Sequence, residues 1–118
     1  MKRPFPVARA RTVAKDAAGM NRTESAYAAY LAEQRLIGVV VEYWFEAIKL
    51  KLAAATFYTP DFLVLTAGGE LECHEVKGFW EDDARVKIKV AAAKFPMRFI
   101  AAKPRAKRDG GGFEIEEF

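Results

Sequence analysis

Two acids and a lysine occur at spacings that would bring them together on neighbouring strands of a β-hairpin. Asp61 follows Pro60 and precedes an apolar run, and Glu75, Val76 and Lys77 come after a glycine turn and a second run. Charged groups beside a hydrophobic core are unfavourable unless they are paired or bind a cation. The arrangement therefore indicates chemistry rather than packing.

The length of the loop between the two runs decides which face of the hairpin each side chain occupies. If residues 67–69 (Ala-Gly-Gly) form a three-residue loop, Asp61 lies opposite Glu75, with Lys77 one diagonal step away on the same face. A two-residue loop would set Asp61 against Val76 and turn Glu75 and Lys77 to the other face. We expect the odd-length loop, or a compensating bulge.

Two carboxylates and an ammonium on one face suit metal-dependent hydrolysis of a phosphodiester. Mg²⁺ takes one or two protein carboxylates and keeps positions for water and a substrate phosphate. A cation would also remove the repulsion between Asp61 and Glu75. Lys77 would stabilise the attacking hydroxide or the transition state, or help to orient the water. Each part is common by itself, because Pro-Asp is an ordinary turn dipeptide and Glu-x-Lys an ordinary surface pair. The combination supports the functional interpretation.

The flanking sequence predicts an α/β fold. We expect a helix over residues 23–36, capped by Thr23, and a second helix over residues 84–94, opened by the acids at 81–83 and stopped by Pro96. Strands are expected over residues 39–50, 58–66, 70–77, 97–102 and 113–118. The order is helix, three strands, helix and one or two strands. It predicts a mixed central sheet flanked by helices, with the second helix as a crossover.

Composition fits one folded domain. The 118 residues are 52% hydrophobic and 30% charged, which is enough for a single packed core. Residues 1–20 are basic and lack a period, so we expect a flexible arm followed by one domain over residues 21–118. The apolar runs are too short to span a membrane, no signal-peptide pattern opens the chain, and the single Cys73 cannot form an internal disulfide. We therefore expect a cytoplasmic protein without membrane association.

Basic residues gather in clusters that suit a polyanion such as nucleic acid, although the net charge is only +3. Solvated surface charge is the alternative for any one cluster. The candidate DNA-binding residues lie on the second helix and in the basic loop before the last strand: Arg85, Lys87, Lys89, Lys103, Arg105, Lys107 and Arg108. Between Lys77 and this helix, Phe79 and Trp80 either stack on an unpaired base or pack beneath the helix.

His74 and Cys73 are neighbours on a strand, so their side chains point to opposite faces and cannot share a metal ion. The chain has no second histidine or cysteine, which excludes a zinc site built from these residue types. We expect Cys73 in the core and His74, beside Glu72, at the surface or at an interface.

The pattern Pro60-Asp61 followed by Glu75-Val76-Lys77 resembles the signature of the PD-(D/E)xK nuclease superfamily. The element order over residues 21–103 looks like the restriction-endonuclease-like core of that superfamily. The resemblance implies an endonuclease that depends on Mg²⁺ or Mn²⁺. It implies that Asp61, Glu75 and the Val76 main-chain carbonyl bind the metal, and that Lys77 is the active-site lysine.

A further acid is implied by the same resemblance. Glu24, on the first helix, matches the position at which many relatives carry an auxiliary metal or water ligand. An acid in the first turn of a helix is also favoured by the helix dipole, whatever its function. Glu42 and Glu46 on the first strand are alternatives for this role.

The short chain with basic segments looks most similar to small phage-encoded endonucleases and to archaeal-type Holliday junction resolvases. This likeness implies branched or structured DNA as the partner, met in the cytoplasm of a bacterial host. Symmetric cutting of two strands requires a homodimer, for which Trp44 is a candidate contact. The alternatives are a nonspecific, single-strand or restriction-like nuclease of the same superfamily, and a non-catalytic DNA-binding module. The intact acids and lysine argue against the last.

Overall fold

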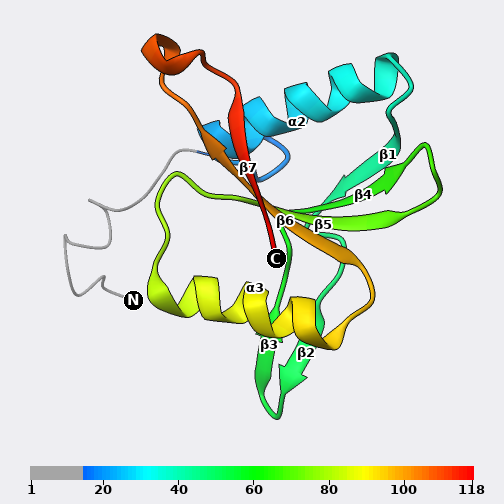
Figure 1. The fold of residues 1–118 in the computed structure, drawn as a ribbon, viewed down its shortest axis with the longest axis vertical. Coiled ribbons are helices and arrows are strands. Elements are labelled where there is room, and N and C mark those ends of the chain that lie inside the picture. Colours follow the sequence, from blue (N-terminus) through cyan, green and yellow to red (C-terminus); the bar gives the residue numbers. More distant parts are fainter. Residues whose placement is uncertain (1–14) are drawn as a thin grey trace.

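The computed structural model describes residues 15–118, which form a mixed β-sheet between two helices (Figure 1). The main sheet has five strands in the order β1-β4-β5-β6-β7, in which β5 and β6 are parallel and the other neighbours antiparallel. A second sheet pairs β2 with β3. The elements are α2 (Arg22–Leu36), β1 (Val40–Phe45), β2 (Leu50–Ala53), β3 (Thr56–Tyr58), β4 (Phe62–Thr66), β5 (Leu71–Val76), α3 (Asp82–Lys94), β6 (Arg98–Pro104), η1 (Lys107–Asp109) and β7 (Phe113–Glu117). The predicted α/β class with a mixed sheet flanked by helices is confirmed.

Each face of the sheet has its own hydrophobic cluster, because side chains alternate along a strand. Helix α2 packs on one face, where Tyr27 and Leu31 meet Phe62 and Val64. Helix α3 and the β2–β3 sheet cover the other face, where Ile88 meets Cys73. Figure 1 shows the main sheet passing between the two helices. A residue on β5 therefore faces either α2 or α3, according to whether its number is even or odd.

Helix α2 begins one residue before the predicted range. Asn21, not Thr23, is the N-cap, and its side chain accepts a hydrogen bond from the Glu24 N–H at 2.8 Å. Glu24 Oε1 accepts from the Asn21 N–H at 2.9 Å, which completes a capping box. Thr23 was the wrong choice because the box needs an acceptor three residues before the glutamate.

The predicted strand over residues 39–50 is wrong in its second half. Strand β1 ends at Phe45, and Glu46 adopts the left-handed conformation with a φ of 49°. This conformation breaks the strand, because a residue with a side chain seldom adopts it within regular structure. The chain then forms the β2–β3 hairpin, which the sequence analysis missed. Lys94 Nζ donates to the Leu52 carbonyl at 2.9 Å and ties this hairpin to α3.

The β4–β5 hairpin has the predicted register. Phe62 pairs with His74 and Leu63 with Cys73, and the Thr66 N–H donates to the Glu70 carbonyl at 2.9 Å. Residues 67–69 therefore form the three-residue loop, in which Gly69 takes a φ of 85° that glycine adopts without strain. Continued by one residue beyond Phe62 and His74, this register sets Asp61 opposite Glu75.

The second half of the chain also follows the prediction. Glu81 occupies the N-cap position of α3 without a side-chain hydrogen bond to the helix, and α3 ends at Lys94 before Pro96 and carries the chain across to β6. Strand β6 runs parallel to β5, so both strands end at the same edge of the sheet. Strand β7 then returns antiparallel along β6 after η1.

Most of the predicted arm over residues 1–20 lies outside the described residues. In its described part, the Asp16 side chain accepts hydrogen bonds from the N–H groups of Ala18 and Met20 and from the Ser25 hydroxyl. Met20 packs against the α2 cluster, so this turn is attached to the start of the helix. None of the helices described within residues 15–118 is long and apolar enough to cross a membrane.

Candidate active site

Asp61 is fixed from three sides at the start of β4. It is 9% exposed and follows Pro60, which is fully buried. Its side-chain Oδ2 accepts from the Val76 N–H at 2.8 Å, and its main-chain carbonyl accepts from the Glu46 N–H at 2.8 Å. The end of β1 and the end of β5 therefore both hold this one residue, and the carboxylate has little freedom to turn.

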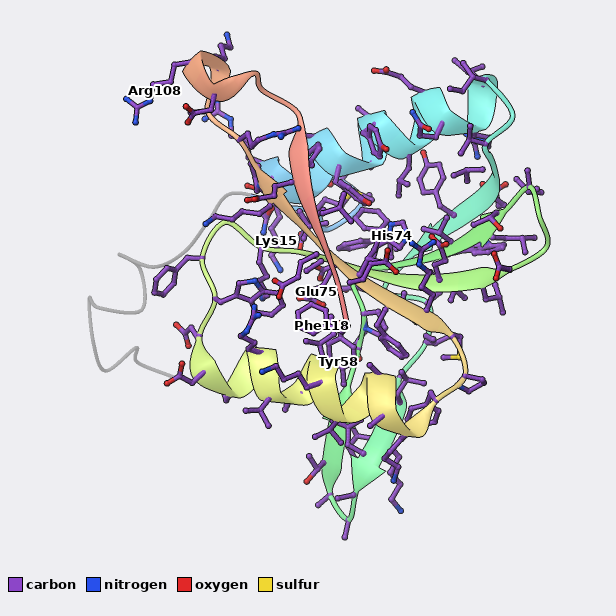
Figure 2. All side chains as sticks on the ribbon, in the orientation of Figure 1. Lys15, Tyr58, His74, Glu75, Arg108 and Phe118 are labelled. Carbon is purple, nitrogen blue, oxygen red and sulfur yellow. The ribbon has the colours of Figure 1, made fainter. Side chains whose placement is uncertain are left out.

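Glu75 lies at the end of β5 on the α3 side of the sheet and is 6% exposed. Its Oε1 accepts from the Tyr58 hydroxyl at 2.6 Å, and Lys77 Nζ lies 3.3 Å from its Oε2. Both carboxylate oxygens are thus positioned by side chains from two different segments. Figure 2 shows Tyr58 beside Glu75 on the side of the sheet that faces α3. The predicted grouping of Asp61, Glu75 and Lys77 is present.

Pro60 leaves one main-chain oxygen of β5 without its ladder donor. Hydrogen-bonded pairs alternate along an antiparallel ladder, and Thr66 and Glu70 form one such pair. Continued two residues beyond the last recorded pair, Phe62 with His74, the alternation would set Pro60 opposite Val76 at the next hydrogen-bonded position. Proline has no N–H to donate to the Val76 carbonyl, while the Val76 N–H donates to Asp61. The Val76 carbonyl is therefore available as a ligand.

The electrostatics of the site oppose the ionised form of Asp61. Burial and, after it, the negative charge of Glu75 raise the pKa of this carboxyl to about 8, although the hydrogen bond from the Val76 N–H acts in the opposite direction. Burial and the Glu75 charge also raise the pKa of the Tyr58 phenol, so Tyr58 remains a hydrogen-bond donor. A cation beside the two carboxylates would reverse the penalty on Asp61.

Glu24 lies close enough to Asp61 to affect it electrostatically, because the Glu24 charge contributes to the raised pKa of Asp61. One of its oxygens is used by the capping box with Asn21. The two alternatives are less well placed. Glu42 is bound to the Arg35 side chain and to the Tyr43 N–H, and these hydrogen bonds lower the pKa of its carboxyl. Glu46 has an exposed side chain.

The donor set fits a hard divalent cation in part. Within residues 15–118, no group of three histidine, cysteine, aspartate or glutamate side chains is arranged to hold a metal ion. Asp61 and Glu75 provide two carboxylates, and Val76 provides a carbonyl oxygen. Mg²⁺ needs no more than this from a protein, since it keeps several waters and accepts substrate phosphate oxygens.

His74 was expected at the surface or at an interface, and the structure contradicts the surface position. It is 5% exposed and faces α2, where its Nδ1 lies 2.7 Å from the Tyr27 hydroxyl and its Nε2 lies 2.9 Å from Glu72 Oε1. Glu72 Oε2 accepts from Arg98 at 3.1 Å. The prediction was wrong because strand alternation gives the face of a residue but not which helix covers that face. Cys73 is fully buried, as predicted.

This buried polar chain links helix and sheet behind the candidate site. Tyr27 lies one turn after Glu24 on α2, and His74 immediately precedes Glu75 on β5. The same residues line a cleft of about 400 Å³ between α2 and the sheet, and Asp61 is not among its lining residues. The hydrogen bonds of this chain therefore hold the helix that carries Glu24 against the strand that carries Glu75.

The candidate DNA-binding residues fall into two groups. On α3, Arg85 is paired with Glu116 of β7, and Lys89 lies near enough to lower the pKa of the same carboxyl, whereas Lys87 is partly buried. The second group is exposed: Lys103 lies near the end of β6 and not in the loop where it was expected, and the β6–β7 connection carries Arg105, Lys107 and Arg108. Figure 2 shows Arg108 at the far tip of this connection. Arg105 donates to the Gly111 carbonyl and Arg108 lies 4.0 Å from Asp109, but all four side chains remain accessible to a polyanion in solvent.

Tyr58 is the site residue that the sequence analysis missed. It lies three residues before Asp61, at the end of β3, and its ring belongs to the cluster beneath α3. An aromatic residue in an apolar run predicts a core position, and Tyr58 does occupy one. Only the folded β2–β3 hairpin brings its hydroxyl to Glu75.

Comparison of the chain with protein-family models, curated proteins and solved structures found no match.

Proposed function

We propose that this protein is a metal-dependent DNA endonuclease with a restriction-endonuclease-like core. The observation that carries the proposal is the convergence of Asp61, Glu75 and Lys77 at one end of the β4–β5 hairpin. Asp61 and Glu75 are buried carboxylates, and the Lys77 ammonium lies 3.3 Å from Glu75. This group of charges serves no packing purpose. Their arrangement supports hydrolysis of a phosphodiester.

Asp61, Glu75 and the Val76 carbonyl would hold Mg²⁺ or Mn²⁺. The raised pKa of Asp61 supports this role, because a divalent cation favours the ionised carboxylate that burial disfavours. When bound, such an ion polarises a phosphoryl oxygen and generates a nucleophilic hydroxide at neutral pH. Tyr58 keeps one oxygen of Glu75 occupied, while the other oxygen, Oε2, faces Lys77.

Lys77 and Glu24 act on the reacting groups. The Lys77 ammonium is partly exposed and lies beside Glu75, so it can hold the attacking water or stabilise negative charge as the phosphate is attacked. Glu24 would orient a second water through the oxygen that the capping box leaves unused. These roles explain why a lysine follows the last residue of β5 and why an acid opens α2.

DNA is the proposed substrate. Because β5 and β6 are parallel, the basic residues that follow β6 leave the sheet at the same edge as Lys77, and this placement supports the proposal. The Lys77 N–H donates to the Ala102 carbonyl at 3.0 Å, so β6 passes beside the active-site lysine before it leads into the basic β6–β7 connection. Lysine and arginine side chains contact the phosphate backbone without reading sequence. We propose branched or structured DNA, recognised by shape by a homodimer in the cytoplasm of a phage-infected host.

The test compares four DNA substrates and matched variants. A four-way junction, a linear duplex, a single strand and a supercoiled plasmid are incubated with wild type in Mg²⁺, Mn²⁺ or EDTA, alongside Lys77→Ala and Glu75→Ala. Lys51→Ala and Glu70→Ala serve as controls at exposed positions away from the site. We expect metal-dependent cleavage that is lost only in the first two variants. Equal cleavage by all five proteins would overturn the proposal, and tight, salt-sensitive binding without cleavage would indicate a binding module instead.

A further inference from the structure

Phe79 is the most exposed large aromatic side chain within residues 15–118. It is 80% exposed, whereas Trp44, Tyr30 and Phe57 are each about half as exposed. A single exposed apolar residue is common on protein surfaces and needs no explanation by itself. The position of Phe79 is what distinguishes it, because only Gly78 separates it from Lys77. Two residues span at most about 7 Å of chain.

The loop that carries Phe79 is anchored on both sides. Before it, the Lys77 N–H is hydrogen-bonded to Ala102. After it, the Trp80 ring meets Phe118 edge-on at 6.0 Å, and the Arg85 guanidinium lies 5.5 Å from the Trp80 ring centre. The sequence offered stacking or packing for the aromatic pair as a whole. The structure separates the two residues: Trp80 packs, and Phe79 remains in solvent.

Charge around Phe79 favours a base over a phosphate as its contact. The exposed acids Glu81, Asp82 and Asp83 follow within four residues and repel a phosphate backbone. Apart from Lys77 and Arg85, which is paired with Glu116, the cations lie at the end of β6 and on the β6–β7 connection, which leaves the same edge of the sheet. Figure 1 shows the β5–α3 loop and the η1 turn on the same side of the molecule. A strand bound through its backbone by these cations would keep its bases free for contact with Phe79.

We propose that Phe79 stacks on an unpaired base next to the scissile phosphate, so that the preferred substrate is DNA with unpaired nucleotides at the cut site. The inference rests on the proposed nuclease function. A phenyl ring stacks on any base, so this contact selects for the absence of pairing and not for sequence. It also explains why an apolar side chain is kept in water beside a charged site.

The first experiment measures cleavage of a perfect duplex and of the same duplex with a short unpaired bubble at the cut site. Wild type should cleave the bubble faster than the perfect duplex, and Phe79→Ala should reduce the ratio of these two rates about tenfold. Phe79→Trp should keep it. Leu36→Ala, which alters an equally exposed apolar side chain at the far end of α2, should behave as wild type. An unchanged preference in Phe79→Ala would overturn the inference and leave the nuclease function intact.

The second experiment does not depend on cleavage. Lys77→Met is mixed in EDTA with a bubble that contains 2-aminopurine, whose fluorescence falls when an aromatic ring stacks on it. The double variant that carries both Lys77→Met and Phe79→Ala should show no quenching, although its basic β6–β7 connection still binds the DNA. Quenching that survives would refute the stacking contact. A shift of the Phe79→Ala protein to a smaller oligomer, with its substrate preference unchanged, would assign Phe79 to a subunit interface instead.

Discussion

The Tyr58 hydroxyl donates a 2.6 Å hydrogen bond to Glu75 Oε1, and both side chains are buried. Tyr58 comes from β3, which does not belong to the main sheet that carries Glu75. The small β2–β3 sheet therefore reaches the site through one hydroxyl group. A hydrogen bond to a buried carboxylate contributes more than one between neutral groups.

Tyr58→Phe should keep the fold and weaken the site. Loss of the hydroxyl leaves Glu75 Oε1 without its donor, so we expect a decrease of about 1–3 kcal/mol in the free energy of unfolding. We also expect weaker Mn²⁺ binding, because Glu75 becomes free to turn. Urea denaturation and calorimetric titration with Mn²⁺ measure the two effects. Tyr30→Phe, at a half-exposed tyrosine of α2, is the control. Unaltered Mn²⁺ affinity would show that Tyr58 does not position Glu75.

Asp61→Asn should change how stability depends on pH. The folded-state pKa of Asp61 is raised from 3.8 to about 8, so between these values the folded protein holds a proton that the unfolded chain releases. Its contribution to stability is therefore fully present below about pH 4 and is lost as the pH rises through about 8. Metal-free wild type should lose stability relative to Asp61→Asn across this range.

Urea denaturation in EDTA from pH 5 to pH 8.5 measures this difference. Asp109→Asn, at an exposed aspartate of η1, should follow wild type. Added Mg²⁺ should stabilise wild type at the upper end of the range more than it stabilises Asp61→Asn. Parallel stability curves for wild type and Asp61→Asn would contradict the raised pKa.

Glu24→Gln and Asn21→Ala should separate the structural role of Glu24 from its chemical role. Glutamine can replace glutamate in a capping box, so Glu24→Gln should remain nearly as stable as wild type but cleave DNA more slowly. Asn21→Ala removes the cap and should lose about 1 kcal/mol of stability. Because this variant keeps the Glu24 carboxylate, its cleavage rate should persist at low temperature. Thermal unfolding and cleavage at saturating Mg²⁺ distinguish the two variants. The opposite pattern would confine Glu24 to helix capping.

Lys107→Gln and Arg108→Gln should weaken DNA binding without loss of stability. If each side chain neutralises one phosphate, each substitution lowers the slope of log affinity against log salt by about one. Anisotropy titrations between low and moderate salt measure the slope. Lys51→Gln, on the β2–β3 hairpin, should leave it unchanged. An equal effect of all three substitutions would indicate attraction by net charge alone.

The parts of the fold that follow from local sequence were predictable. The register of the β4–β5 hairpin depends on the length of one glycine loop, and α3 is bounded by Glu81 and Pro96. The parts that depend on distant contacts were not. Glu46 gave no sign that β1 would break there, because glutamate rarely adopts a positive φ.

The site shows the same division. Asp61, Glu75 and Lys77 were found because they lie on one hairpin, where pairing can be counted along the chain. Tyr58 was missed because its contact with Glu75 arises from the β2–β3 hairpin. His74 was misplaced because its partner Tyr27 lies 47 residues away. Contacts between elements need the packing of the whole domain, which a pattern along one segment does not contain.

Cys73 makes the opening of this site observable in the unmodified protein. It is the only cysteine of the chain, it is fully buried on β5, and burial raises the pKa of its thiol to about 12. A thiol reagent can therefore react only when β5 leaves the sheet. Because Cys73 lies two residues from Glu75, the rate of modification reports how often the candidate metal-binding strand unfolds locally. An ion that bridges Asp61 and Glu75 should slow this reaction, and the amount of slowing reports occupancy of the site without any DNA present.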